Sequence, residues 1–186
     1  AVGNVTAHAV AVWTAGEAFS LRNIHVVNSN SDYTTGISLN HADGVLIKNV
    51  EEEGAQGDGI LADGAPNLTI DNSVFYNNQN TGGRGGGFAG GAANLKILNS
   101  TFLNNGRDQI GAHNIYARHL TNALFQGNLL VGGSNEGIVI HGASDGITIR
   151  GNDFHGNSNA LGISGYGSSN DVFIYVLVEK NIIHDN

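Results

Sequence analysis

The sequence predicts an all-β parallel solenoid, in which short strands wind into coils that stack on one another. Seven related segments begin at residues 19, 45, 68, 95, 123, 147 and 176, at intervals of 23 to 29 residues. Within each repeat, short runs alternate apolar and polar residues, and no segment between them has helical spacing. The 186 residues include 28 Gly, many Asn and a single Pro, which disfavours helices and favours tight turns. Together these observations predict stacked coils of strands.

Two series of segments define the strands expected in each coil. The first series has an alternating strand, then Asn, Gly or Lys at the fifth place, then a second short apolar strand. Its members are "FSLRNIHV", "VLIKNVEE", "LTIDNSVF", "LKILNSTF", "ALFQGNLL", "ITIRGNDF" and "VLVEKNII". The second series supplies one more strand per coil: "AVAVW" at 9, "GISLN" at 36, "GILAD" at 59, "GFAGG" at 87, "NIYAR" at 114, "GIVIH" at 137 and "GISGY" at 162.

This pattern resembles the right-handed parallel β-helix of the pectin lyase-like superfamily, over nearly the whole chain. The resemblance implies about seven coils with three short strands each, and an Asn ladder in the turn between the second and third strands. Asn accepts left-handed backbone, its amide can bond the copy one coil away, and Gly reaches positive φ by having no Cβ. The expected ladder residues are Asn23, Asn49, Asn72 and Asn99, continued by Gly127 and Gly151.

We expect residues 1–186 to form one domain, whose first and last coils look open. Exposed terminal coils promote aggregation, so we expect either a piece of a longer chain with additional domains or a homo-oligomer that covers the ends. The apolar run "DVFIYVLVE" at 171–179 fits two interpretations equally. It packs as a cap or against another subunit or domain, or it belongs to the core.

Charge and composition exclude several classes of partner. The net charge of −8 disfavours binding to nucleic acid or to an anionic membrane surface. No stretch approaches 18 apolar residues, so we expect no membrane span. The absence of Cys excludes disulfides, thiolate nucleophiles and Cys-metal sites. We expect an extracellular location, either secreted, at a cell surface or on a phage virion.

Side chains alternate across the strands of the second series, which fixes the surface they form. The expected inward residues are Ile37, Leu39, Ile60, Ala62, Phe88, Gly90, Ile115, Ala117, Ile138, Ile140, Ile163 and Gly165. The expected outward residues are Ser38, Asn40, Leu61, Asp63, Ala89, Gly91, Tyr116, Arg118, Val139, His141, Ser164 and Tyr166. Small residues at Gly86, Ala89 and Gly91 predict a hollow beside the coil that carries "HNIYARH" (113–119), and the two longest loops, 77–86 and 104–113, flank that coil.

The resemblance implies that this outer face is a polysaccharide groove. The candidate catalytic residues are His113, Tyr116, Arg118 and His141, and the candidate substrate-binding residues are Asp58, Asp63, Arg84, Arg107, Asp108, His119, Glu136 and Tyr166. Proton removal at C5 of a uronate needs a cation to neutralise the carboxylate, a base and an acid. Arg118 suits the first role, a His the second and Tyr116 the third. In residue types this set resembles polysaccharide lyases and mannuronan C5-epimerases of the same fold, although no complete signature of either is present.

Other interpretations stay open at this point. Asp58, Asp63, Asp108 and Glu136 could instead serve a glycoside hydrolase. A non-catalytic glycan-binding or structural solenoid, such as part of a tail spike, an adhesin or a surface protein, fits the lack of a complete motif. No cofactor is certain. Calcium between Asp58 and Asp63, or a metal held by His113, Glu136 and His141, is compatible with the spacing. His25, His155 and His184 lie outside the groove face and receive no function.

Overall fold

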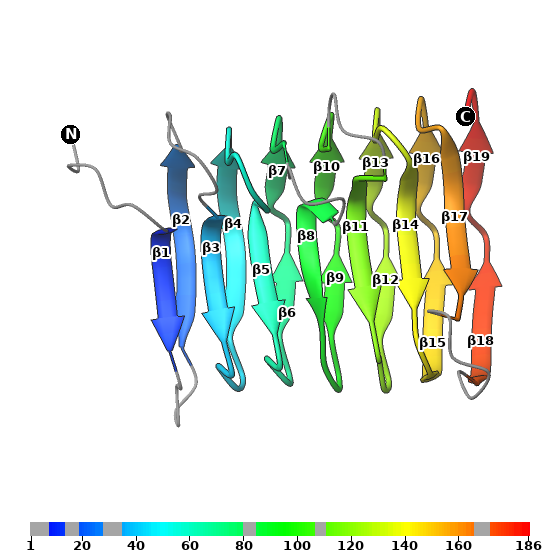
Figure 1. Ribbon diagram of the computed structural model, residues 1–186, viewed down its shortest axis with the longest axis horizontal. Helices are drawn as coiled ribbons and strands as arrows, with labels where there is room; N and C mark the ends of the chain where they lie inside the picture. The colour runs from blue at the N-terminus through cyan, green and yellow to red at the C-terminus, as the bar shows by residue number, and fades with distance from the viewer. Residues whose placement is uncertain (1–7, 14–18, 28–34, 80–84, 107–110, 166–171) are drawn as a thin grey trace.

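A computed structural model describes residues 8–13, 19–27, 35–79, 85–106, 111–165 and 172–186 of the chain. These residues form a stack of coils that runs from the N-terminus at one end to the C-terminus at the other (Figure 1). The strands pair in parallel with their neighbours one coil away, and the described part of the chain contains strands and turns without a helix. No helix there has the length and apolarity to cross a membrane. The predicted fold class, an all-β parallel β-helix, is confirmed.

The first sheet consists of seven strands, one from each coil, and it contains the segments of the second sequence series. They pair in the order β1 (His8–Trp13), β3 (Thr35–Asn40), β5 (Ile60–Asp63), β8 (Gly85–Gly91), β11 (His113–Arg118), β14 (Glu136–His141) and β17 (Asn159–Ser164).

The second sheet supplies the other two strands of each coil. In the first two coils they are continuous, as β2 (Ser20–Val27) and β4 (Leu46–Glu53). In later coils a turn divides them into pairs: β6 (Thr69–Asp71) and β7 (Val74–Tyr76), β9 (Lys96–Leu98) and β10 (Thr101–Leu103), β12 (Leu124–Gln126) and β13 (Leu129–Val131), β15 (Ser144–Arg150) and β16 (Asp153–His155), β18 (Phe173–Glu179) and β19 (Ile182–His184). Each later coil therefore has three strands, as expected.

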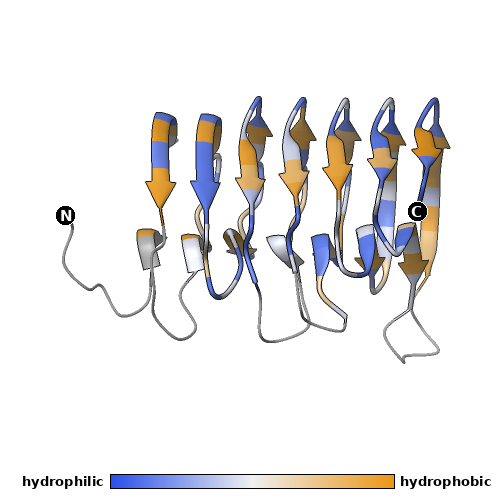
Figure 2. Cartoon of the chain, turned by 90° about the horizontal axis from the view of Figure 1, so that it is seen from above, coloured by the Kyte–Doolittle hydropathy of each residue, from blue (hydrophilic) through white to orange (hydrophobic). Residues whose placement is uncertain are grey.

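The core consists of apolar columns that run along the axis of the stack. Ile37, Ile60, Phe88, Ile115 and Ile138 occupy equivalent positions in successive coils and are fully buried. Figure 2 shows apolar segments recurring on the strands from coil to coil, which is the alternation seen in the sequence. Like residues thus stack on like residues, because each coil presents the same face to the next.

The predicted ladder lies in the turn that divides the second sheet. Asn23, Asn49, Asn72 and Asn99 all have φ between 47° and 54°, and Gly127 and Gly151 have φ of 66° and 61°. Asn49 Nδ2 donates to Asn23 Oδ1 at 2.9 Å, and Asn72 Nδ2 donates to Asn49 Oδ1 at 2.8 Å. Asn99 departs from the pattern and donates to Asp71 Oδ1 at 3.2 Å. Both expected properties, left-handed backbone and rungs between coils, are confirmed, with this one exchange of acceptor.

The register predicted for the last coil is wrong by two residues. Ile163 pairs with Ile140 and Ser164 with His141, so Leu161, not Ile163, continues the column of Ile138. Ser164 therefore occupies the position beside His141. The glycine of "GISGY" is not equivalent to Gly137 of the preceding coil, because Ala160 occupies that position in the last coil.

The apolar run 171–179 mainly forms strand β18, which pairs with β15. It is therefore part of the solenoid and not a separate cap. Ile174, Tyr175, Leu177 and Val178 on it are exposed.

Candidate functional site

The pairing of β11 with β8 is irregular at the start of the stretch 113–119, where β8 has one residue more than β11 between two register partners. His113 pairs with Gly85 of β8, whereas Ile115 pairs with Phe88, so the register shifts between them. An irregularity of this kind lets two consecutive side chains face the same side of the sheet. Asn114 and Ile115 both point inward and are fully buried, which leaves His113 and Tyr116 on the outer face.

Asn114 is inward because it completes a buried ladder of amides. Asn105 donates from its backbone N–H and from Nδ2 to Asn114 Oδ1, at 3.3 and 3.0 Å. Asn114 Nδ2 in turn donates to Asn157 Oδ1 at 2.9 Å. The equivalent ladder position of this coil is Gly133, where a Cβ would lie 3.0 Å from Asn114 Nδ2. Asn114 therefore supplies the amide that Gly133 lacks.

Four other coils have Gly at the position of Asn114, namely Gly36, Gly59, Gly87 and Gly137. A Cβ would lie 2.3 Å from Glu52 Oε1 at Gly36, 2.6 Å from Phe102 at Gly87 and 2.8 Å from Phe154 at Gly137. Side chains of the second sheet fill that space in those coils. In "HNIYARH", Asn114 thus takes the place of Gly for a structural reason. Its inward side chain fixes the directions in which His113 and Tyr116 point.

Three rings lie in a row on the outer face of β11 and β14. The centroid of Tyr116 lies 5.9 Å from that of His113 and 5.3 Å from that of His141, with tilts of 35° and 50°. Tyr116 is 8% exposed and His113 5%, whereas His141 is half-buried. The ring row therefore has a buried end at His113 and a more accessible end at His141.

Glu136 contacts His113 at the buried end of the ring row. Its Oε2 lies 2.7 Å from His113 Nδ1, and its backbone N–H donates to the same nitrogen at 3.3 Å. The carboxylate suits a protonated ring and the N–H suits a neutral one, so Nδ1 has a partner in both states. Burial lowers the pKa of His113, the Glu136 carboxylate opposes this effect, and His141 lowers the pKa further when it is protonated. The surroundings of His113 therefore favour its neutral form.

Ser164 positions the accessible end of the row. His141 Nδ1 lies 2.9 Å from Ser164 Oγ, across the pairing of β14 with β17. A hydrogen bond at Nδ1 fixes the orientation of the imidazole. Ser164 was missed as a site residue because of the register error in the last coil.

Arg118 pairs with Asp63 across an intervening coil. Arg118 Nη2 donates to Asp63 Oδ1 at 2.9 Å, and both side chains are partly exposed. Asp63 pairs in register with Gly91 of β8, where a Cβ would lie 1.7 Å from the Arg118 carbonyl oxygen. Because β8 has no side chain at this point, Arg118 can reach over it to β5. An exposed pair of this kind contributes under about 1 kcal/mol, so a ligand carboxylate can compete with Asp63 for the guanidinium.

The hollow expected at the small residues of β8 is not formed at its glycines. A Cβ on Gly86 would lie 2.3 Å from the Gly106 backbone nitrogen, and the space at Gly91 holds the Arg118 backbone. Ala89 is 1% exposed. These residues allow close approach of neighbouring coils instead of opening a cavity.

Of the remaining predicted site residues, the structure describes Asp58 and His119. Asp58 is buried, and His119 lies in the turn after β11 with φ of 50°, over Gly142. Arg84, Arg107, Asp108 and Tyr166 lie outside the described residues.

A buried acid that the sequence did not reveal lies inside the stack. Glu52 is fully buried in the core column that continues as Phe75 and Phe102. Asn78 Nδ2 donates to its Oε2 at 2.7 Å, and Oε1 has no hydrogen-bond partner. Burial raises the pKa of this carboxyl to about 8, so Glu52 is mostly protonated at neutral pH. Glu52 caps the amide ladder at Asn78.

Three potential metal ligands gather at a place that the sequence analysis did not consider as a metal site. Within the described ranges, the one set of three potential ligands whose donor atoms lie within 4.8 Å of one another is Asp153, His155 and His184. His113, Glu136 and His141, the other three-residue set considered, do not meet this criterion among the described residues. The shared position of His155 and His184 one repeat apart was the available sequence signal.

Comparisons with known proteins agree with this architecture. The family described as "Right handed beta helix region" matches residues 8–175. Among solved structures, the periplasmic alginate epimerase AlgG is similar with a TM-score of 0.66 at 12% identity, covering 89% of this chain and 39% of that chain. A single-substitution mutant of that epimerase gives the same TM-score at 13% identity and the same coverage. The chain thus spans well under half the length of these proteins, and at such identity the likeness shows the fold alone. No curated protein matches the chain.

Proposed function

The chain belongs to the right-handed β-helix family, and on that basis we propose that it acts on an acidic polysaccharide. The proposed reaction is removal of the C5 proton of a uronate residue, followed by epimerisation or elimination. The ring row of His113, Tyr116 and His141 beside Arg118 is the observation that supports it. The name of the structural neighbour, an alginate epimerase, suggests alginate as the first substrate to test.

Each group in the site has a role that its surroundings suit. Arg118 binds the uronate carboxylate in place of Asp63, which stabilises the negative charge that develops when C5 loses its proton. His141, held at Nδ1 by Ser164 and in register with Arg118, is the more accessible imidazole and acts as the base. Tyr116 is the proton donor. His113 and Glu136 are positioning residues, because they pack behind Tyr116 and adjust the charge beside it.

The bonds that change distinguish the two outcomes. In both, the C5–H bond breaks and its proton moves to the base. In epimerisation a proton returns to C5 from the other face of the ring, and no glycosidic bond breaks. In elimination the C4–O bond breaks, the leaving oxygen takes a proton, and an unsaturated uronate remains.

The test is incubation of alginate with the protein in deuterated water, followed by proton NMR. Deuterium at C5 without chain cleavage indicates epimerisation, and absorbance of an unsaturated uronate indicates elimination. His141→Ala and Tyr116→Phe should each lower the rate by at least about 100-fold. His41→Ala replaces an exposed histidine in the turn after β3 and is the control, which should leave the rate unchanged.

Two results would overturn the proposal. One is full activity in a triple variant of His113→Ala, Tyr116→Phe and Arg118→Ala. The other is release of reducing ends with neither deuterium at C5 nor an unsaturated product, since this would indicate a hydrolase.

A further inference from the structure

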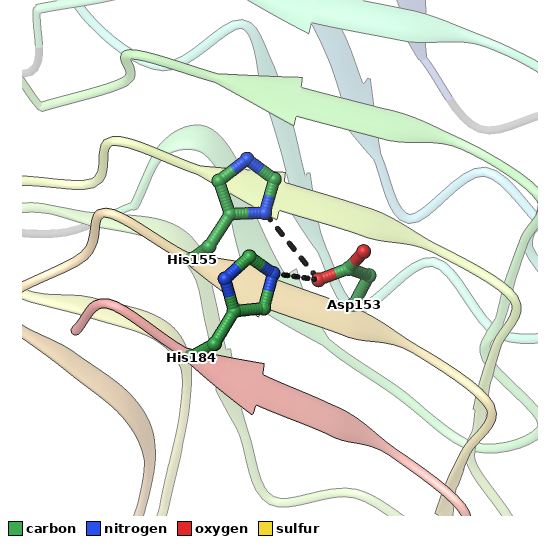
Figure 3. Close-up of side chains that lie close together, drawn as sticks. All are labelled: Asp153, His155 and His184. Atoms are coloured by element: carbon green, nitrogen blue, oxygen red, sulfur yellow. Dashed lines mark hydrogen bonds and ion pairs between the residues drawn. The ribbon is translucent and has the colours of Figure 1, made fainter.

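Two histidines and an aspartate gather on the outer face of the second sheet, away from the first sheet and its ring row. Asp153 and His155 lie two residues apart on β16, so their side chains face the same side. His184 of β19 is the register partner of His155, and the two rings stack with centroids 4.8 Å apart. Figure 3 shows both imidazoles converging on the Asp153 carboxylate.

The distances within this group fit a bound metal ion. Asp153 Oδ1 lies 3.3 Å from His155 Nδ1 and 3.3 Å from His184 Nε2. Ligands at 2.0–2.2 Å from a tetrahedral ion are about 3.4 Å from each other. Three donor atoms that lie within 4.8 Å of one another therefore need only small side-chain rotations to share one ion.

A second carboxylate orients one of the imidazoles. His184 Nδ1 lies 3.0 Å from Asp185 Oδ2, on the side of the ring opposite to Nε2. Histidine ligands usually donate their second N–H to a carboxylate, which fixes the tautomer and makes the other nitrogen a better ligand. The arrangement Asp185–His184–Asp153 has this order.

We infer that Asp153, His155 and His184 bind one divalent transition-metal ion of the zinc class. Imidazole and carboxylate ligands together suit such ions, whereas softer metal ions prefer thiolate ligands, which this site does not contain. The three side chains are partly exposed, so the remaining coordination positions face solvent and accept water or an external carboxylate. The ion would join β16 to β19 and so link two adjacent coils. This inference is independent of the proposed function, because none of its residues belongs to the first sheet.

The test is isothermal titration of the chelator-treated, untagged protein with ZnCl₂. We expect one ion per chain and a higher unfolding temperature in its presence, because ligands that bind only the folded state stabilise it. His155→Ala, His184→Ala and Asp153→Asn should each weaken binding at least tenfold. Asp185→Asn should weaken it about tenfold.

His25→Ala is the matched control. His25 lies on the same sheet at the other end of the stack, with Glu53 Oε1 3.3 Å from its Nε2. Binding should be unchanged in this variant. A second readout is the NMR spectrum of the protein with paramagnetic Co²⁺, which should shift the ring signals of His155 and His184 and leave those of His25 in place.

Absence of saturable binding up to about 1 mM Zn²⁺ would overturn the inference and leave the group as an ion-pair network. Binding that persists in His155→Ala and His184→Ala, or that is lost in His25→Ala, would overturn it as well.

Discussion

Replacing Asn114 with Gly tests whether the buried amide ladder holds the central coil together. The variant gives this coil the residue that Gly36, Gly59, Gly87 and Gly137 supply elsewhere, so local sequence similarity would predict no harm. The structure predicts the opposite. In the native chain two donors of Asn105 converge on Asn114 Oδ1, and removal of this oxygen leaves the buried Asn105 backbone N–H without an acceptor.

The expected cost follows from these groups. A buried orphan donor costs about 1–3 kcal/mol. The greater backbone freedom of Gly in the unfolded chain adds about 0.5–1 kcal/mol. Two other groups retain a hydrogen-bond partner in the variant and so add nothing to the loss. The Gly133 N–H still donates to Asn157 Oδ1 (2.9 Å), and Asn105 Nδ2 still donates to the Phe75 carbonyl oxygen (2.9 Å). Asn114→Gly should therefore lower the free energy of unfolding by about 1.5–4 kcal/mol.

Urea unfolding followed by circular dichroism measures this difference, with Gly133→Asn as the companion variant. Alone, Gly133→Asn should destabilise the protein, because its Cβ would lie 3.0 Å from both Asn114 Nδ2 and Asn157 Oδ1. Combined with Asn114→Gly it returns an amide to the ladder and should recover most of the loss. A change below about 0.5 kcal/mol for Asn114→Gly, or no recovery in the double variant, would refute the ladder account.

Three further outcomes are expected. Glu52→Gln should stabilise the protein at pH 8 but not at pH 4. Burial raises the Glu52 pKa to about 8 in the folded state, which therefore binds the proton more tightly than the unfolded chain does. The free energy of unfolding of the native protein should then fall by about 1.4 kcal/mol per pH unit between pH 4.5 and pH 8. Equal pH slopes for the native protein and Glu52→Gln in urea unfolding would contradict this. Glu136→Gln should lower the pKa of His113 further, because the carboxylate now opposes the effect of burial, and an unchanged imidazole titration by NMR would count against that assignment. Asn72→Ala should cost about 1–2 kcal/mol more than Asn72→Gly, since φ is 48° there and both lose the same rung; similar unfolding midpoints would show that the left-handed backbone is not the cause.

The sequence predicts the coil architecture well because each coil repeats the same local requirements. Asn72 and Gly127 occupy turns whose left-handed backbone few other residues accept, so these turns can be recognised from the sequence alone. Ile115 and Ala117 alternate with Tyr116 in the pattern that places them in the core. These features depend on a residue and its immediate neighbours.

The parts that could not be predicted depend on which residues meet across coils. The exchange between Asn114 and Gly133 requires knowing that residues 19 positions apart share one ladder. The pairing of His141 with Ser164 requires a register that Ala160 obscures. Glu52 stands in an alternating strand among other acids, and only its parity with Phe75 in the next coil places it inside.

The direction of the buried amides has a consequence for how coils could be exchanged during evolution. Asn78, Asn105, Asn114 and Asn157 each donate from Nδ2 to an acceptor on the C-terminal side and accept at Oδ1 from the N-terminal side. The hydrogen bonds between these amides therefore all run in the same direction along the stack. A duplicated coil of any loop length could be inserted between two others if it carries one inward amide, at either of two positions. Between Asn78 and Asn157, loop lengths are free to diverge under this rule, whereas each coil must keep an inward amide.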